Sequence, residues 1–205
     1  LSDSDAAIFT VNAVNDAPVI TSSPDTTAVQ DQLYQYQVTA TDADSNDVLH
    51  YRLLKAPAFL SIDSTTGLIS GTPSNADVGA HDVSVQVHDT SWATDEQDYQ
   101  LTVKNQNDPP VVGDIPDQTI DEGQSFTQIH LDDYVSDPDN SDAEMTWTYA
   151  GNHDLQVSID ANRVATITPP DSNWNGGETI TFTATDPGGL SDSDAATFTV
   201  NAVND

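Results

Sequence analysis

Apolar and polar residues alternate along several short stretches of the chain. Between residues 34 and 40 every second side chain is Tyr, Val or Ala, and the residues between them are Gln or Thr. The same alternation returns over residues 49–53, 83–87 and 99–103. A repeat of two residues is typical of a half-buried strand, and no segment keeps a 3.6-residue period for three helical turns. The first half of the chain is therefore predicted to consist of strands and turns.

The second half of the chain carries the same signal. Its strands are expected at Ile129/Leu131, Met145/Trp147/Tyr149, Leu155/Val157/Ile159, Ile180/Phe182 and Phe198/Val200. Short alternating strands separated by Gly and Pro are typical of an immunoglobulin-like β-sandwich. A chain of 205 residues has room for two such domains, each with its own core. The pattern thus predicts an all-β protein of two tandem Greek-key β-sandwiches.

A polar run, residues 105–110 (NQNDPP), separates the two predicted domains. The prolines have a fixed φ and no N–H, so they favour an extended exit and cannot continue a sheet. Asn105, Asn107 and Asp108 offer amide, carboxylate and backbone oxygens, and no Lys or Arg interrupts them. Oxygen ligands of this kind suit Ca²⁺. We expect residues 105–108 to form a calcium-binding linker.

The chain also contains an internal repeat. Residues 1–16 match residues 190–205 except that Ile8 stands where the second copy has Thr197. A repeat of this kind indicates an array of tandem domains. The expected organisation is a closing strand of a preceding repeat plus linker (1–16), a first domain (17–104), the linker (105–108) and a second domain (109–205).

The charge of the chain is extreme, with 34 Asp and Glu against 4 Lys and Arg, a formal balance of −30. Nucleic acid and anionic membrane surfaces would be repelled. No apolar run reaches the roughly 20 residues needed to span a bilayer, so membrane insertion is not expected. Cysteine is absent, which excludes disulfides and thiolate metal sites. A metal ion bound by oxygen ligands is then the remaining cross-link that could stabilise small domains of this kind.

Both predicted domains resemble cadherin-like families. Residues 49–53 (LHYRL), 58–63 (AFLSID), 66–73 (TGLISGTP) and 78–85 (VGAHDVSV) resemble the dystroglycan-type cadherin-like domain over nearly the whole first domain. Residues 120–124 (IDEGQ), 135–139 (VSDPD), 173–177 (NWNGG) and 182–190 (FTATDPGGL) are similar to the cadherin-like repeats of very large bacterial surface adhesins. The resemblance implies a secreted or cell-surface bacterial protein with a role in extension and cell adhesion.

The resemblance also implies which residues would bind Ca²⁺ between successive domains. Beside the linker residues, Asp137 and Asp139 match the Asp-x-Asp of the upper loop of a cadherin domain, and Asp186 matches the Asp before the last strand. Asp77 lies near the matching acidic turn of the first domain. Where cadherins have a Glu before the second strand, the first domain has Gln30 followed by Asp31, which implies either weaker binding of calcium or Asp31 as a substitute ligand.

Two further half-sites are expected at the outer ends, each completed by a neighbouring cadherin-like repeat. They consist of Asn15, Asp16, Asp42, Asp44 and Asp89 above, and Glu122, Asp171 and Asp205 below. Each Asp-x-Asp pair also has a simpler interpretation, because Asp side chains accept hydrogen bonds from their own turns. Most of the other carboxylates are expected to form a solvated surface.

Two other functions stay open. The first is a carbohydrate-binding module of a secreted polysaccharide-degrading system, which the resemblance also implies, with Trp92 and Tyr99 as the candidate stacking residues. Trp92 lies in a polar loop with little core to join, so its ring either folds over the sandwich edge or forms an exposed binding face. The second is self-association that depends on calcium, or exchange of residues 6–14 for the closing strand that they duplicate. Catalysis has little support: the five histidines show no metal-binding spacing, and no nucleophile elbow or phosphate loop is present.

Overall fold

The computed structural model describes residues 14–204, which fall into two compact units divided between Gln106 and Asn107. We refer to these units as the first and second domains. The predictions for residues 1–13, including strand exchange, and for Asp205 lie outside the described residues. Among the residues described, no helix is long and apolar enough to cross a bilayer.

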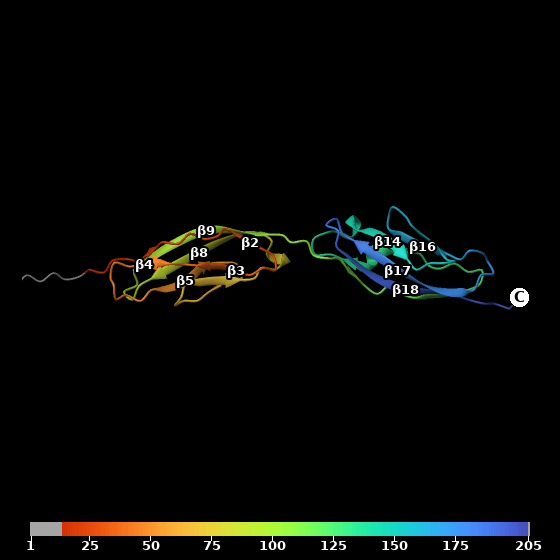
Figure 1. Ribbon diagram of the computed structural model, residues 1–205, viewed down its shortest axis with the longest axis horizontal. Helices are drawn as coiled ribbons and strands as arrows, with labels where there is room; N and C mark the ends of the chain where they lie inside the picture. Colours follow the sequence, from red (N-terminus) through yellow and green to blue (C-terminus); the bar gives the residue numbers. More distant parts are fainter. Residues whose placement is uncertain (1–13, 205) are drawn as a thin grey trace, which may run out of the picture. The chain divides into compact units, whose positions relative to one another are not determined.

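The first domain is a sandwich of two main sheets (Figure 1). One sheet has four strands in the order β2 (Thr27–Val29), β9 (Thr94–Lys104), β8 (Gly79–His88) and β5 (His50–Lys55). The other has the order β3 (Tyr34–Gln37), β7 (Leu68–Gly71) and β6 (Ser61–Ile62). A short pair, β1 (Val19–Ile20) with β4 (Ala40–Thr41), and the 3-10 helix η1 (Asn75–Asp77) complete the domain.

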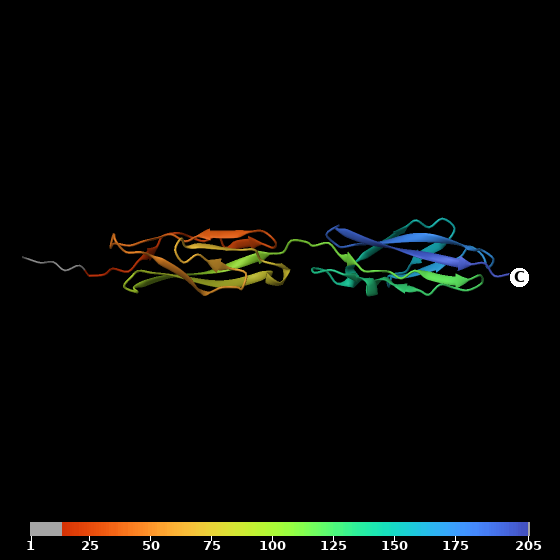
Figure 2. The same ribbon diagram turned by 90° about the horizontal axis from the view of Figure 1, so that it is seen from below.

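The second domain is a sandwich as well (Figure 2), and its two main sheets repeat this strand order. Its larger sheet runs β11 (Gln118–Asp121), β18 (Ser191–Asn201), β17 (Gly176–Thr185) and β14 (Thr146–Ala150). Its smaller sheet runs β12 (Ile129–His130), β16 (Val164–Thr168) and β15 (Gln156–Ile159). The pair of β10 (Val111–Val112) with β13 (Val135–Ser136) and the 3-10 helices η2 (Leu131–Tyr134) and η3 (Asp142–Glu144) lie outside the two sheets. The prediction of two all-β, immunoglobulin-like domains in tandem is confirmed.

Each domain has its own core, formed by the alternating apolar residues. Val83, Val85 and Val87 of β8 point inward in the first domain, and Phe198 and Val200 of β18 do so in the second. Side chains at the positions between them face outward because successive residues of a strand point to opposite faces. The period-two pattern therefore predicts correctly which face of each sheet is buried.

Two predicted strands are shorter than the alternation suggests. Residues 34–40 form two strands in different sheets, because β3 pairs with β7 whereas β4 pairs with β1. The alternation at Ile129 ends after two residues, since Leu131 begins η2 and is buried there. In both places the backbone changes direction while the apolar side chains still reach the core.

Candidate metal centre

Side-chain oxygens from three segments meet at one end of the second domain. Asn107 donates from Nδ2 to Oδ2 of Asp186 at 2.7 Å. The backbone N–H of Asp108 donates to Oδ2 of Asp139 at 2.7 Å. Asp139 in turn donates its own N–H to Oδ1 of Asp137 at 2.7 Å. The turn after β17, the loop after β13 and the entering chain thus bring together five residues that the resemblance implies as ligands.

The first domain builds the same arrangement from different sequence. Asn15 donates from Nδ2 to Oδ2 of Asp89 at 2.7 Å, and the N–H of Asp16 donates to Oδ2 of Asp44 at 2.8 Å. The N–H of Asp44 donates to Oδ1 of Asp42 at 2.9 Å. We call each of these two sets of five residues an upper cluster. Each of the three hydrogen bonds described for one upper cluster has a counterpart in the other.

The deepest residue of each upper cluster is a buried carboxylate. Asp89 is 0% exposed and Asp186 is 5% exposed. The hydrogen bond from Asn15 lowers the pKa of Asp89 and outweighs the effect of burial, which raises it. Burial is the largest influence on the pKa of Asp186, but the hydrogen bonds from Asn107 and from the backbone of the following turn together lower that pKa. Both side chains are therefore ionised at neutral pH.

Four buried oxygens near these residues have no hydrogen-bond partner among the residues described. They are Oδ2 of Asp42, Asp47 and Asp137 and Oδ1 of Asn140. A buried acceptor without a donor destabilises the folded state by roughly 1 to 3 kcal/mol, and more when it carries charge. A hard divalent cation would satisfy such oxygens, since Ca²⁺ binds six to eight oxygen ligands. The chemistry of the donor set thus fits calcium.

Asp47 and Asn140 were not predicted from the sequence. Carboxylate oxygens of Asp42, Asp44 and Asp47 lie within 4.8 Å of one another, and Thr90 donates to Oδ1 of Asp47 at 2.9 Å. The signal that could have found Asp47 is its place in residues 42–47 (DADSND), where carboxylates or amides occupy four of six positions. The same density surrounds Asn140, in residues 137–142 (DPDNSD), so the same signal could have found it.

Most of the ligands expected away from the upper clusters, at what we call the lower ends of the domains, make local hydrogen bonds and do not gather into a cluster. Asp77 accepts hydrogen bonds from the N–H and hydroxyl of Ser74 at 2.8 and 2.7 Å, which closes the turn of η1. Asp171 accepts the N–H of Asn173 at 2.9 Å. Asn105 is exposed and belongs to the first domain.

Gln30, where the first domain departs from the cadherin pattern, corresponds to Glu122 of the second domain. The N–H of Gln30 donates to Lys104 O, and that of Glu122 donates to Asn201 O, both at 3.0 Å. Gln30 is 1% exposed, and its amide donates to Oδ2 of the neighbouring Asp31 at 3.3 Å. Glu122 instead accepts from Asn175 at 2.7 Å. The lower end of the second domain therefore offers a carboxylate where the first has an amide.

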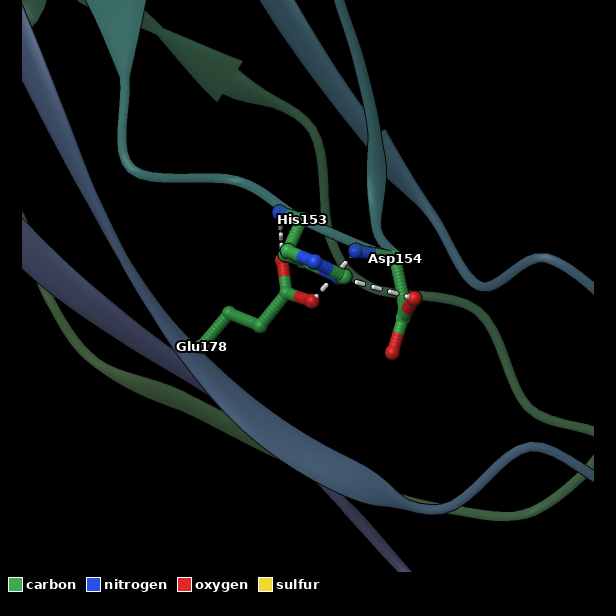
Figure 3. A group of neighbouring side chains, drawn as sticks. All are labelled: His153, Asp154 and Glu178. Carbon is green, nitrogen blue, oxygen red and sulfur yellow. Dashed lines mark hydrogen bonds and ion pairs between the residues drawn. The ribbon is translucent and has the colours of Figure 1, made fainter.

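A third group of titratable side chains lies in the second domain (Figure 3). The carboxylate of Glu178 accepts the N–H groups of His153 and Asp154 at 2.8 and 2.6 Å, and that of Leu155 at 3.3 Å. The imidazole of His153 lies 3.1 Å from Oδ1 of Asp154, and both side chains are exposed. Glu178 therefore anchors the loop that precedes β15, and this role accounts for the group without a metal.

The two candidate stacking residues lie on opposite faces of the same sheet. Trp92 is exposed in the turn between β8 and β9, and its ring stacks on His88. Tyr99 points inward, packs edge-on against Tyr36 and has its pKa raised by burial. The structure does not bring Trp92 and Tyr99 together, because only the former has an open ring face.

Comparison with known proteins agrees with the two-domain fold. Residues 17–104 match the family described as "Putative Ig domain", and residues 107–201 match the family described as "Bacterial Ig domain". No curated protein matches the sequence. Among solved structures, PcdhgB3 EC1-4 superposes with a TM-score of 0.64 at 19% identity, over 93% of this chain and 51% of that one.

A second solved structure matches along its full length. Human protocadherin-24 EC1-2 superposes with a TM-score of 0.58 at 17% identity, and the match covers 93% of this chain and 100% of that one. Protocadherin gammaB7 EC3-6 gives a TM-score of 0.57 at 23% identity, over 93% and 49%. The chain thus spans about half the length of the first and third of these structures. At these identities the likeness shows the fold alone.

Proposed function

The chain is a tandem of two cadherin-like, immunoglobulin-type domains of the kind found in extracellular adhesion proteins, and on that premise we propose that its upper clusters bind Ca²⁺. The observation that carries this proposal is the set of buried, unpartnered oxygens of Asp42, Asp47, Asp137 and Asn140. Each belongs to an upper-cluster Asp or to a residue close to one in the chain, and no Lys or Arg side chain makes an ion pair with an upper-cluster carboxylate among the described residues. A bound divalent cation would both satisfy these oxygens and neutralise the crowded charge.

Bound Ca²⁺ would have a structural role, because it would hold together oxygen ligands from separate segments of the chain. Asp137, Asp139 and Asp186 would contribute carboxylate oxygens in the second domain, and Asn107 would contribute its amide oxygen. In the structure Asn107 donates from its amide nitrogen to Asp186. Because the two ends of an Asn amide differ only in which atom is O and which is N, a flip of this side chain would present oxygen to the ion.

We propose further that bound calcium stiffens the tandem chain, and that the protein is an extension module of a large secreted bacterial adhesin. Neighbouring cadherin-like repeats would be its partners along the chain. Without the ion, carboxylates of one sign repel one another, so calcium would control how extended the array is. The role is one of binding and mechanics rather than catalysis.

Isothermal titration of the chelator-treated chain with CaCl₂ tests the binding step. We expect saturable binding, Ca²⁺ preferred over Mg²⁺, and loss of one class of sites in Asp137→Asn. Asp154→Asn is the matched control, because Asp154 is exposed and lies outside both upper clusters. Absence of saturable heat in the unmodified chain would refute calcium binding.

Small-angle scattering with calcium and with chelator tests the stiffening step separately. The expected result with calcium is a narrower distribution of shapes and a larger maximum dimension. If calcium binds in the titration but the two scattering curves coincide, the ions stabilise individual domains and the stiffening proposal is wrong.

A further inference from the structure

Trp92 is the most exposed aromatic side chain in the described part of the chain, at 68%, and its backbone is in an unusual conformation. Its φ is +68°, in the left-handed region that bulky residues rarely adopt. Residues held in such a conformation cluster at functional sites, where the surrounding structure compensates for the strain. Core packing does not explain this residue, because most of the indole is in solvent.

The second domain shows which residue this turn favours. In the first domain the N–H of Trp92 donates to Asp89 O at 3.3 Å, and the N–H of Asp89 donates to Ala93 O at 3.1 Å. In the second, Gly189 donates to Asp186 O at 3.2 Å, and Asp186 donates to Leu190 O at 2.9 Å. Gly189, with φ of +90°, is thus the counterpart of Trp92. Glycine adopts this conformation without strain, so the fold itself does not require tryptophan here.

His88 supports the indole of Trp92, and His50 packs against His88 in turn. The rings of Trp92 and His88 stack at a centroid distance of 4.3 Å and an angle of 12°. His50, directly opposite His88 on β5, lies 5.5 Å from it. Nδ1 of His88 is 3.0 Å from the carbonyl oxygen of Asp89, which fixes the orientation of the imidazole. One face of the indole is therefore supported and the other is open.

The support is specific to the first domain. The pair opposite one another at the equivalent place in the second domain is Thr146 and Thr185. The three residues of the stack, His50, His88 and Trp92, thus correspond to Thr or Gly at the equivalent positions of the second domain. Because the second domain has the same strand order without them, the fold itself does not require the stack.

A row of linked polar side chains lies beside the stack on the same sheet face. Nε of Arg52 donates to Oε1 of Gln86 at 2.7 Å, and Nε2 of Gln86 donates to Oε1 of Glu96 at 2.6 Å. These residues are two positions along their strands from the stack, which corresponds to about 7 Å. Arg52 and Glu96 are exposed, so the guanidinium N–H groups and a carboxylate oxygen can bind further groups.

We propose that Trp92 and this polar row bind sugar rings of a neutral polysaccharide. An open indole face offers a flat apolar surface for the C–H groups of a pyranose, and the row offers donors and acceptors for its hydroxyls. The formal charge of −30 disfavours polyanions, including sulfated and uronate-rich glycans. None of the side chains of the proposed site is a proposed calcium ligand, although Trp92 lies in the turn that begins at Asp89.

Affinity electrophoresis of the whole chain tests this site. Native gels would contain dextran, laminarin, galactomannan or arabinoxylan, with alginate as the anionic comparison, each run with calcium and with chelator. We expect retardation in at least one neutral gel and none in alginate. Trp92→Gly, which installs the residue of the second domain, should weaken binding roughly tenfold or more. Its melting temperature should be unchanged or higher, because the left-handed conformation suits glycine.

Leu33→Gly is the control, since Leu33 is an exposed apolar residue in another part of the first domain. It should leave the retardation unchanged. Free mobility of the unmodified chain in all four neutral gels, or equal retardation of Trp92→Gly, would overturn the proposal. If sedimentation instead shows self-association that Trp92→Gly abolishes, the partner of this face is a second copy of the chain and the sugar assignment is wrong.

Discussion

The substitution Asp137→Asn should stabilise the second domain in the presence of a chelator and destabilise it in the presence of calcium. The substitution keeps Oδ1, which accepts the N–H groups of Asp139 and Asn140 at 2.7 and 2.9 Å. It changes only Oδ2, which is buried and has no partner. Replacing that oxygen by an amide nitrogen removes one crowded negative charge and supplies donors to the neighbouring carboxylates. In chelator the variant should gain about 1 kcal/mol.

Calcium reverses the sign of this effect. An ion that binds only the folded domain at a hundredfold excess over its Kd stabilises it by about 2.7 kcal/mol. Loss of a carboxylate ligand that weakens binding roughly a hundredfold leaves only about 0.4 kcal/mol of that stabilisation. After the gain of about 1 kcal/mol, Asp137→Asn is less stable than the unmodified domain by about 1 kcal/mol. For a domain of this size, 1 kcal/mol corresponds to a shift in Tm of roughly 4 to 8 °C.

Differential scanning calorimetry in chelator and in calcium measures both signs on the same protein. Asp154→Asn changes the net charge equally and should show no reversal. Equal destabilisation by Asp137→Asn in both conditions would mean that Asp137 only closes its turn, and it would refute the reasoning from the unpartnered oxygen. A Tm of the unmodified chain that does not respond to calcium would refute it as well.

Three further outcomes follow from the packing and hydrogen bonds. Phe198→Ala should destabilise the second domain by about 3 to 5 kcal/mol and leave the first-domain transition in place, because each domain has its own core; calorimetry would contradict this if both transitions moved. Gly71→Ala should lower the denaturant midpoint of the first domain, since the added Cβ would lie 1.9 Å from the carbonyl oxygen of Phe59; an unchanged midpoint would contradict that geometry. The hydrogen bond from the N–H of Val164 lowers the pKa of Asp160 below its ordinary value of 3.8. The ionised carboxylate of Asp160 therefore stabilises the folded state above pH 3.8, and this stabilisation is lost as the pH falls through the pKa of the folded state. Asp160→Asn should therefore flatten the decline of stability between about pH 5 and about pH 2, and urea titrations that decline in parallel for both proteins would exclude this role.

The alternation of side chains was sufficient to predict the four long strands β8, β9, β17 and β18 and their buried faces. Val83, Val85 and Val87 are nearly inaccessible, as their spacing indicates, because a strand has only two faces and the core selects the apolar one. The Asn and Asp residues of the upper clusters were predicted from a family resemblance, and the structure brings ten of them together in two sets of five. Which of their oxygens lack partners could not be predicted, since that depends on backbone N–H groups supplied by loops distant in sequence.

The sequence by itself determined that this protein has two sandwiches, an acidic surface and no thiol chemistry, because period, composition and length are local or additive properties. Only the tertiary structure decided that Asp47 and Asn140 belong with the upper clusters, that Tyr99 faces inward, and that Trp92 takes the place of a glycine. These facts depend on strand register and turn conformation, which are set when segments far apart in the chain pair. A side chain acquires its chemical role from neighbours that the linear order does not reveal.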